Sequence, residues 1–145
     1  MPTPIYPGDG LFVDTAGWAG IVLPNTPEYR TMEAFYKRAI ATRRDLITTN
    51  YVLGELVALL TARSRTSRRQ ILAYISGIRS IAHLTIVHVD AATDTEAWAL
   101  LAQQDDKAWS LVDAASFVVM RQLGLQEAFT TDQHFSQAGF LRVPP

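Results

Sequence analysis

Short apolar runs alternate along this chain with longer segments in which apolar residues recur every three or four positions. The short runs are typical of strands and cover residues 10–14, 46–48, 84–89, 127–130 and a small run near 140–143. The longer segments predict helices at residues 27–44, 51–63, 67–82, 93–103 and 110–123. Strands that alternate with helices favour an α/β fold, namely a three-layer α/β/α sandwich around a mainly parallel central sheet.

Local signals indicate where some of these helices begin. Pro27 suits the first turn of the first predicted helix, and Glu33 stands four residues before Lys37, where the two side chains can pair. Thr93 and Glu96 have the spacing of a capping box, which predicts the start of the fourth helix.

The composition is that of a globular protein. The chain has 145 residues, of which 48% are hydrophobic and 19% are charged, so we expect one domain spanning residues 1–145. No apolar run approaches the ~20 residues that a membrane-spanning helix needs, and the first residues lack the pattern of a secretory signal. The absence of cysteine excludes disulfides and thiolate chemistry and is compatible with a cytoplasmic location.

The net charge of −1 gives no overall field that would attract nucleic acid, but the arginines are unevenly distributed. Five of them and no acidic residue lie between Arg63 and Arg79. This segment is either an ordinary solvated helix face or a basic surface that holds phosphates. The candidates for such contacts are Arg63, Arg65, Arg68 and Arg69.

Two aspartates directly follow predicted strands. Asp14 ends the run "GLFVD" and Asp132 ends the run "AFTTD". In parallel sheets, ligands bind at the carboxyl ends of the strands, beside a switch in strand order. We therefore expect both carboxylates to line one cleft, although each could instead cap the helix or turn that follows it.

Two further acids lie in apolar helical segments. Glu55 stands in "NYVLGELVALLTAR", where no Lys or Arg is among its nearest helical neighbours. A buried carboxylate without a partner is costly unless it is protonated or binds a cation. Asp113 stands in "WSLVDAASFVVM", where Ser110 offers a capping box and the apolar helix behind it implies burial. Capping and ligand binding are compatible for Asp113.

Four carboxylates in one cleft would repel one another unless they were protonated or bound cations. Ligation by oxygen alone suits Mg²⁺ or Mn²⁺ and does not suit zinc. Two such ions stabilise the attacking and leaving oxygens when a phosphodiester is cleaved. The acids therefore predict metal-assisted phosphodiester hydrolysis, provided that the fold brings them together.

Other polar residues rank lower as functional candidates. Asp90 stands before its own helix, and Asp105 and Asp106 lie in a polar loop. For His134, packing or a turn hydrogen bond is favoured over contact with a substrate phosphate. The chain contains neither a nucleotide-binding glycine motif nor a serine nucleophile elbow, and its histidines lack metal-ligand spacing.

The blocks "LFVDTAGW", "LITTNYVLGEL", "WSLVDAASFVVM" and "AFTTDQHF" resemble, in order, the acidic blocks of the PIN-domain nucleases, and most of all VapC-type toxins of toxin–antitoxin systems. The resemblance covers essentially the whole chain. It implies that the metal-binding catalytic acids are Asp14, Glu55, Asp113 and Asp132. It also implies polar supporting roles for Thr15, Asn50, Ser116 and Thr130.

The resemblance implies an Mg²⁺- or Mn²⁺-dependent endoribonuclease that cleaves RNA by attack of water, with Glu55 helping to position metal and water. It further implies an antitoxin partner and a homodimer. A PIN-like module that binds RNA or acts as a scaffold without catalysis is the alternative, and retention of all four acids argues against it. A phospho-accepting receiver domain fits poorly, because the paired acids and the late-strand Lys of such domains are missing.

Overall fold

The structure, a computed structural model, describes residues 10–145, and its strands form one parallel sheet. The strands are β1 (Leu11–Val13), β2 (Leu46–Thr49), β3 (Leu84–Val87), β4 (Glu127–Phe129) and β5 (Leu141–Val143). Their order is β3-β2-β1-β4-β5, and every neighbouring pair is parallel. The chain thus moves outward from β1 to β3 and then crosses to β4 on the other side of β1. The strand order therefore switches between β1 and β4, and this is the position where α/β sheets bind ligands.

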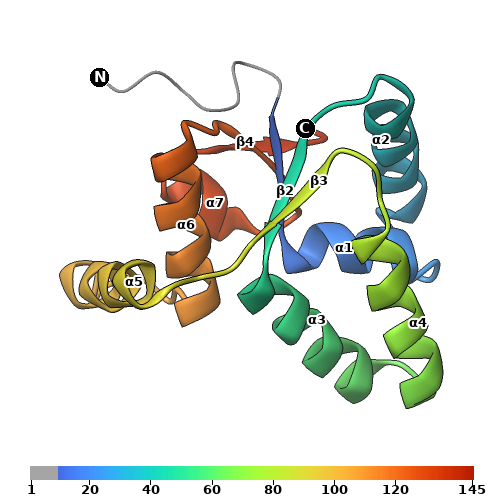
Figure 1. The fold of residues 1–145 in the computed structure, drawn as a ribbon, viewed down its shortest axis with the longest axis horizontal. Helices are drawn as coiled ribbons and strands as arrows, with labels where there is room; N and C mark the ends of the chain where they lie inside the picture. The colour runs from blue at the N-terminus through green and yellow to red at the C-terminus, as the bar shows by residue number, and fades with distance from the viewer. Residues whose placement is uncertain (1–9) are drawn as a thin grey trace.

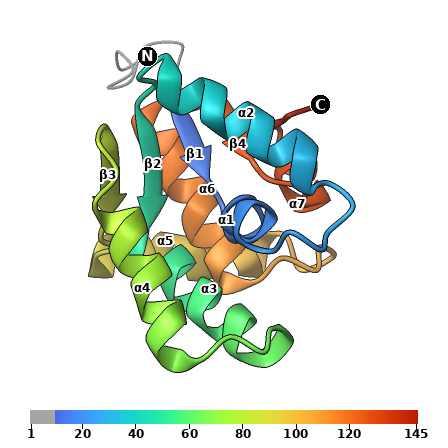
Figure 2. The same ribbon diagram turned by 90° about the vertical axis from the view of Figure 1, so that its right-hand side faces the viewer.

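Helices cover both faces of this sheet. They are α1 (Thr15–Val22), α2 (Tyr29–Ala41), α3 (Asn50–Arg63), α4 (Arg68–Arg79), α5 (Ala91–Gln103), α6 (Leu111–Leu123) and α7 (Gln133–Gln137). In Figure 1 α5, α6 and α7 lie on one side of the strands and α1, α2 and α4 on the other, and Figure 2 gives the same division. The three-layer α/β/α sandwich with a parallel sheet is confirmed. Within residues 10–145 no helix is long and apolar enough to cross a membrane.

Buried side chains connect the central strand β1 to the helix that follows it at the carboxyl end of the sheet. Phe12 and Trp18 are fully buried. The indole Nε1 of Trp18 donates a hydrogen bond to Thr48 Oγ1 at 3.2 Å, and the Thr48 hydroxyl donates to the carbonyl of Val13 at 2.8 Å. These bonds satisfy buried polar groups and fix α1 against β1 and β2, just beyond the point where β1 ends.

Helix α1 was not among the helices predicted from the sequence. Its two glycines, Gly17 and Gly20, lower the intrinsic helix propensity of the segment. The packing explains why a glycine is needed: a Cβ on Gly17 would lie 2.1 Å from the carbonyl oxygen of Phe129 in β4. Tertiary contact with β4 therefore decides the local structure, against propensity.

Helix α2 is shorter than predicted at both ends. It begins at Tyr29 with Glu28 at the N-cap, so the expected place of Pro27 in the first helical turn is wrong. The helix ends at Ala41, and Arg43 then adopts a left-handed backbone with φ of 56°. The chain can turn into β2 through this conformation.

The pairing of Glu33 with Lys37 on α2 is confirmed, with 3.1 Å between Nζ and Oε1. The predicted capping box at the start of α5 is wrong. This helix begins at Ala91, and Asp90 caps it by accepting a hydrogen bond from the Thr93 backbone N–H at 2.8 Å. Thr93 therefore lies inside the first turn of α5, and Asp90 is the N-cap of this helix.

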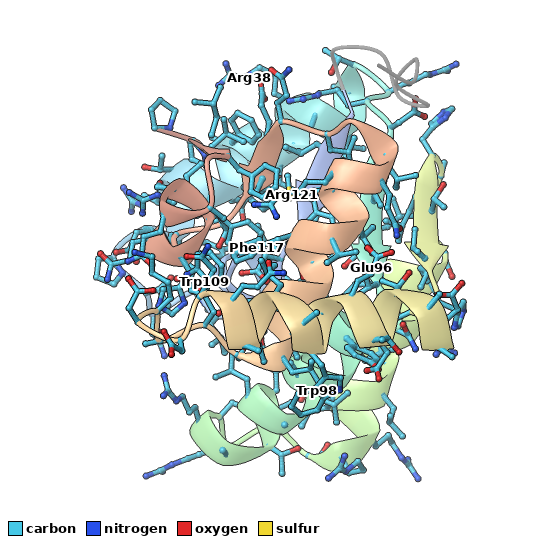
Figure 3. The ribbon with its side chains drawn as sticks, turned by 90° about the vertical axis from the view of Figure 1, so that its left-hand side faces the viewer. Arg38, Glu96, Trp98, Trp109, Phe117 and Arg121 are labelled. Carbon is cyan, nitrogen blue, oxygen red and sulfur yellow. The ribbon has the colours of Figure 1, made fainter. Side chains whose placement is uncertain are left out.

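Aromatic packing holds α6 and α7 together. Trp109 meets Phe117 edge-on, with ring centroids 4.9 Å apart, and Figure 3 shows both beside α6, behind the crossing helix α5. Phe117 in turn meets the fully buried Phe135 of α7 edge-on at 4.9 Å. The Trp109 indole also donates a hydrogen bond to Gln137 at 3.0 Å. The residues that follow Asp132 thus form a short helix fixed to the start of α6.

Candidate active site

Asp14 lies directly after β1, at the switch in strand order. It is 2% exposed and stands at the N-cap of α1, but its side chain makes no capping hydrogen bond. One carboxylate oxygen, Oδ2, accepts a hydrogen bond from the Thr130 hydroxyl at 3.0 Å. The other, Oδ1, is buried and has no hydrogen-bond partner of standard geometry in the described part of the chain. A buried acceptor without a donor is rare in proteins and indicates a place for a missing ligand or proton.

The environment of Asp14 favours its protonated form. The pKa of Asp14 is raised from 3.8 to about 7, mainly by burial and also by the negative charges of Asp113 and Glu55. The Thr15 backbone and the Thr130 hydroxyl act in the opposite direction by hydrogen bonding. Near neutral pH this carboxyl is therefore partly protonated in the metal-free protein, and a bound cation would favour its ionised form.

Glu55 reaches the same place from α3. Its side chain is half-buried, and burial is the main cause that raises the pKa of this carboxyl. The charges of Asp113 and Asp132 raise that pKa too, while the nearby Thr15 hydroxyl lowers it. Glu55 is thus close enough to Asp113 and Asp132 for their charges to act on it, while the ligand atoms that lie within 4.8 Å of one another in the described chain are those of Asp113, Asp132 and His134.

Asp113 and Asp132 complete the cluster from α6 and α7. Asp113 is 5% exposed and forms the predicted capping box, in which its Oδ2 accepts from the Ser110 backbone N–H at 3.0 Å. Asp132 is the N-cap of α7 and accepts from the backbone N–H of His134 at 2.9 Å. Both aspartates are caps and members of the cluster at once.

Thr130 connects the two strand-end aspartates. Its hydroxyl donates to Asp14 Oδ2 at 3.0 Å and accepts a hydrogen bond from the Asp132 backbone N–H, also at 3.0 Å. Thr130 is 1% exposed, so both bonds are shielded from water. The supporting position predicted for Thr130 agrees with this geometry, because one hydroxyl fixes the spacing between the ends of β1 and β4.

The other three predicted supporting residues have structural hydrogen bonds or none. The Asn50 side chain accepts from the Val89 backbone N–H at 2.8 Å, which ties the start of α3 to the segment after β3. Ser116 is fully buried and donates to the Val112 carbonyl at 2.8 Å, one turn back in α6. Thr15 Oγ1 is buried beside Glu55 without a hydrogen bond of standard geometry to any described residue.

His134 is the neighbour of the acids that sequence reasoning missed. Its Nδ1 lies 2.9 Å from Asp113 Oδ2 and 3.4 Å from Asp132 Oδ1. The favoured interpretation, packing or a turn hydrogen bond, accounts for the backbone of His134 but not for its ring. The signal available in the sequence was the spacing Asp132-x-His134 directly after a strand, which places both side chains on the first turn of one helix.

The remaining candidates lie outside this cluster. Asp105 and Asp106 are exposed in the turn after α5, where Asp106 pairs with Lys107 at 3.2 Å. The four arginines predicted to contact RNA or a partner are exposed at the end of α3, in the following loop and at the start of α4. Arg63 and Arg65 line one hollow of about 610 Å³ together with the loop after α1.

The PIN domain family matches residues 11–141, so the chain belongs to the PIN-domain family. It is 39% identical over 136 residues to the 23S rRNA-specific endonuclease VapC20 of Mycobacterium tuberculosis, covering 93% of this chain and 98% of that protein. The crystal structure of that protein, titled a sarcin-ricin loop cleaving toxin, matches with a TM-score of 0.79 and 36% identity, covering 93% of this chain and 99% of that one. The resemblance to VapC-type PIN nucleases is confirmed.

More distant solved structures share the fold. FitAcB from Neisseria gonorrhoeae matches with a TM-score of 0.63 and 19% identity, covering 91% of this chain and 95% of that one. VapBC2 from Rickettsia felis, bound to a DNA fragment from its promoter, matches with a TM-score of 0.61 and 12% identity, covering 92% and 96%.

The titration of Asp14 makes the free energy of unfolding of the metal-free protein depend on pH, and this dependence can be measured. Its pKa is about 7 in the fold and 3.8 in an exposed chain, so the folded state binds an extra proton between these values. The resulting stability is present at low pH and is lost as the pH rises toward 7. From pH 5 to pH 8 in EDTA, urea unfolding should show the natural protein losing about 2–3 kcal/mol relative to Asp14→Asn. An offset between the two proteins that is constant with pH would contradict this expectation.

Proposed function

We propose that this chain is a metal-dependent endoribonuclease of the toxin class, which cleaves RNA by attack of water on a phosphodiester. The observation that carries the proposal is the convergence of carboxyls from four separate segments at the switch in strand order. One of them, Asp14, is buried with an unpartnered oxygen and a pKa raised to about 7. The family membership and the VapC20 similarity support the same activity.

The donor set fits a hard divalent cation. The cluster presents carboxylate oxygens, which Mg²⁺ and Mn²⁺ prefer. Asp14, Asp113 and Asp132 would hold the metal. When bound, a divalent cation would lower the pKa of an attacking water and neutralise charge that develops on the phosphate. The unpartnered Oδ1 of Asp14 is the atom of this set that most needs such a counter-charge.

Glu55 has a different role in this proposal. Its side chain is half-buried, and burial raises the pKa of the carboxyl above that of an exposed glutamate, which makes it a stronger base. Glu55 would orient the attacking water and take its proton. The Thr15 hydroxyl beside it would hold the carboxylate in place.

The substrate class follows from the relative and from the surface charge. VapC20 is named for 23S rRNA, and ribosomal RNA is the first substrate to test for this chain. We expect a cytoplasmic location for the protein, because ribosomal RNA is found there. The exposed Arg63, Arg65, Arg68 and Arg69 would contact the RNA backbone or a cognate antitoxin. A homodimer is the assembly that we expect.

The test is a cleavage assay on purified ribosomes and on a panel of single-stranded and structured RNAs. The protein should cleave with Mg²⁺ or Mn²⁺ and should not cleave in EDTA, and activity should return when the metal is added back. RNA binding without cleavage on every substrate and with either ion would favour the alternative of a catalytically silent binding module.

A further inference from the structure

His134 is held against two acids of the cluster by the packing of α7. Its backbone N–H donates to Asp132 Oδ1 at 2.9 Å. The next residue, Phe135, is fully buried and contacts the rings of Phe12 and Phe117, with centroids 6.2 and 4.9 Å away. The backbone is thus fixed on both sides of His134, and the contacts of Nδ1 with the two carboxylates hold the ring at the cluster. The side chain is therefore part of the preorganised site.

The distances around His134 match those of neighbouring ligands on one metal ion. Nδ1 lies 2.9 Å from Asp113 Oδ2 and 3.4 Å from Asp132 Oδ1. One ligand atom from each of the three residues lies within 4.8 Å of the other two. Adjacent ligands of an octahedral ion with bonds of about 2.1 Å are about 3 Å apart. His134 Nδ1 can therefore lie adjacent to an oxygen of each of the two carboxylates around a single ion.

We propose that His134 Nδ1 is a nitrogen ligand of the same divalent ion as Asp113 and Asp132, and that it makes the site select Mn²⁺ over Mg²⁺. This inference rests on the proposed metal-dependent function. A neutral imidazole that carries its hydrogen on Nε2 leaves Nδ1 free to coordinate. Imidazole adds little to the binding of Mg²⁺, which demands oxygen, but it strengthens the binding of the softer Mn²⁺.

An independent observation indicates that an ion belongs beside these residues. Asp14 is 2% exposed, its Oδ1 is without a hydrogen-bond partner of standard geometry in the described chain, and its carboxyl interacts electrostatically with Asp113. A hydrogen bond from His134 to Asp113 alone would leave that oxygen unsatisfied. A cation that the three ligands hold near Asp14 would supply the missing counter-charge.

The direct test is electron spin-echo spectroscopy on Mn²⁺ added to the full-length natural protein, to His134→Gln and to His134→Asp. A coordinated imidazole couples the ¹⁴N nucleus to the electron spin of Mn²⁺, whereas a residue that acts only by hydrogen bonding does not. We expect ¹⁴N modulation in the natural protein and none in either variant. His88→Gln, a change at an exposed histidine just after β3, is the matched control and should keep the signal.

Equilibrium binding supplies the second measurement. The ratio of the Mg²⁺ and Mn²⁺ dissociation constants should fall about tenfold or more in His134→Gln. His134→Asp should keep Mg²⁺ binding while it loses the preference for Mn²⁺, because it exchanges nitrogen for oxygen. Thermal unfolding of each protein checks that the fold is retained.

The outcomes separate this inference from the proposed function. Mn²⁺ binding without nitrogen coupling, or coupling that survives in His134→Gln, would overturn the ligand assignment while metal-dependent RNA cleavage still stood. If the protein showed nitrogen coupling but cleaved no RNA, the ligand assignment would stand and the proposed endoribonuclease activity would be overturned. A natural protein that binds no Mn²⁺ at millimolar concentration would overturn the ligand assignment outright.

Discussion

Asp14→Asn is expected to lower RNA cleavage by at least about 100-fold while the protein remains folded. The substitution removes the charge of the most buried acid and the unpartnered oxygen that would face the metal. An amide oxygen can still accept the hydrogen bond from Thr130, so the link between the ends of β1 and β4 is kept. The measurement is the initial rate of cleavage with saturating Mn²⁺ or Mg²⁺, together with the thermal unfolding curve.

Asp105→Asn provides the control for charge alone, since Asp105 is exposed in the turn after α5 and lies outside the cluster. It makes the same chemical change and should leave the rate within about twofold of the natural protein. If Asp14→Asn cleaved as fast as Asp105→Asn, the carboxylate cluster would not be the catalytic centre. If Asp14→Asn lost both activity and a cooperative thermal unfolding transition, the loss of activity would be explained by misfolding.

Gly17→Ala is expected to destabilise the protein by about 3 kcal/mol or more, the largest effect on stability that the structure predicts for a single methyl group. The new Cβ would lie 2.1 Å from the Phe129 carbonyl oxygen and 2.9 Å from the Phe129 ring. A backbone oxygen in β4 cannot move aside as a flexible side chain can, so α1 must shift away from the sheet. Because Asp14 directly precedes α1, the shift would also disturb the acidic cluster.

Other glycines supply graded controls for this prediction in urea unfolding experiments. A Cβ on Gly20 would meet the Met32 side chain at 3.1–3.5 Å, which can adjust, so Gly20→Ala should cost less. Nothing lies within 4 Å of a Cβ on Gly77 in α4, so Gly77→Ala should be neutral or stabilise by up to about 1 kcal/mol. Equal effects at Gly17 and Gly77 would mean that α1 does not pack on β4 as the structure has it.

Much of the fold was accessible from the sequence because it depends on periodicity. The alternation of apolar strands with amphipathic helices defines a parallel α/β sheet, and the acids that follow strands then meet at its carboxyl edge. Asp14 and Asp132 were found in this way, and Glu55 was found because its helix offered no basic neighbour. Their roles in metal binding and catalysis remain predictions, which the Asp14→Asn assay addresses.

Two of the misses share a cause, which is that tertiary contacts decided the outcome. The intrinsic helix propensity of residues 15–22 is low because of Gly17 and Gly20, yet close packing on β4 makes a glycine necessary at position 17. The ring of His134 takes its position from the burial of Phe135, a contact between elements that local spacing does not reveal. Asp90 and Thr93 were each plausible caps for α5, and the structure selects Asp90.

The position of β4 has a consequence for how the protein is made. β1 is synthesised before the other strands, but its neighbour β4 is synthesised only near the end. The hydrogen bond from Thr130 to Asp14 can therefore form only when synthesis has nearly finished. Domains begin to fold as the chain emerges, yet this pairing joins two distant parts of it. A nascent chain that has not reached Asp132 therefore lacks the second flank of the cluster, so the acidic site can be complete only when synthesis has nearly finished.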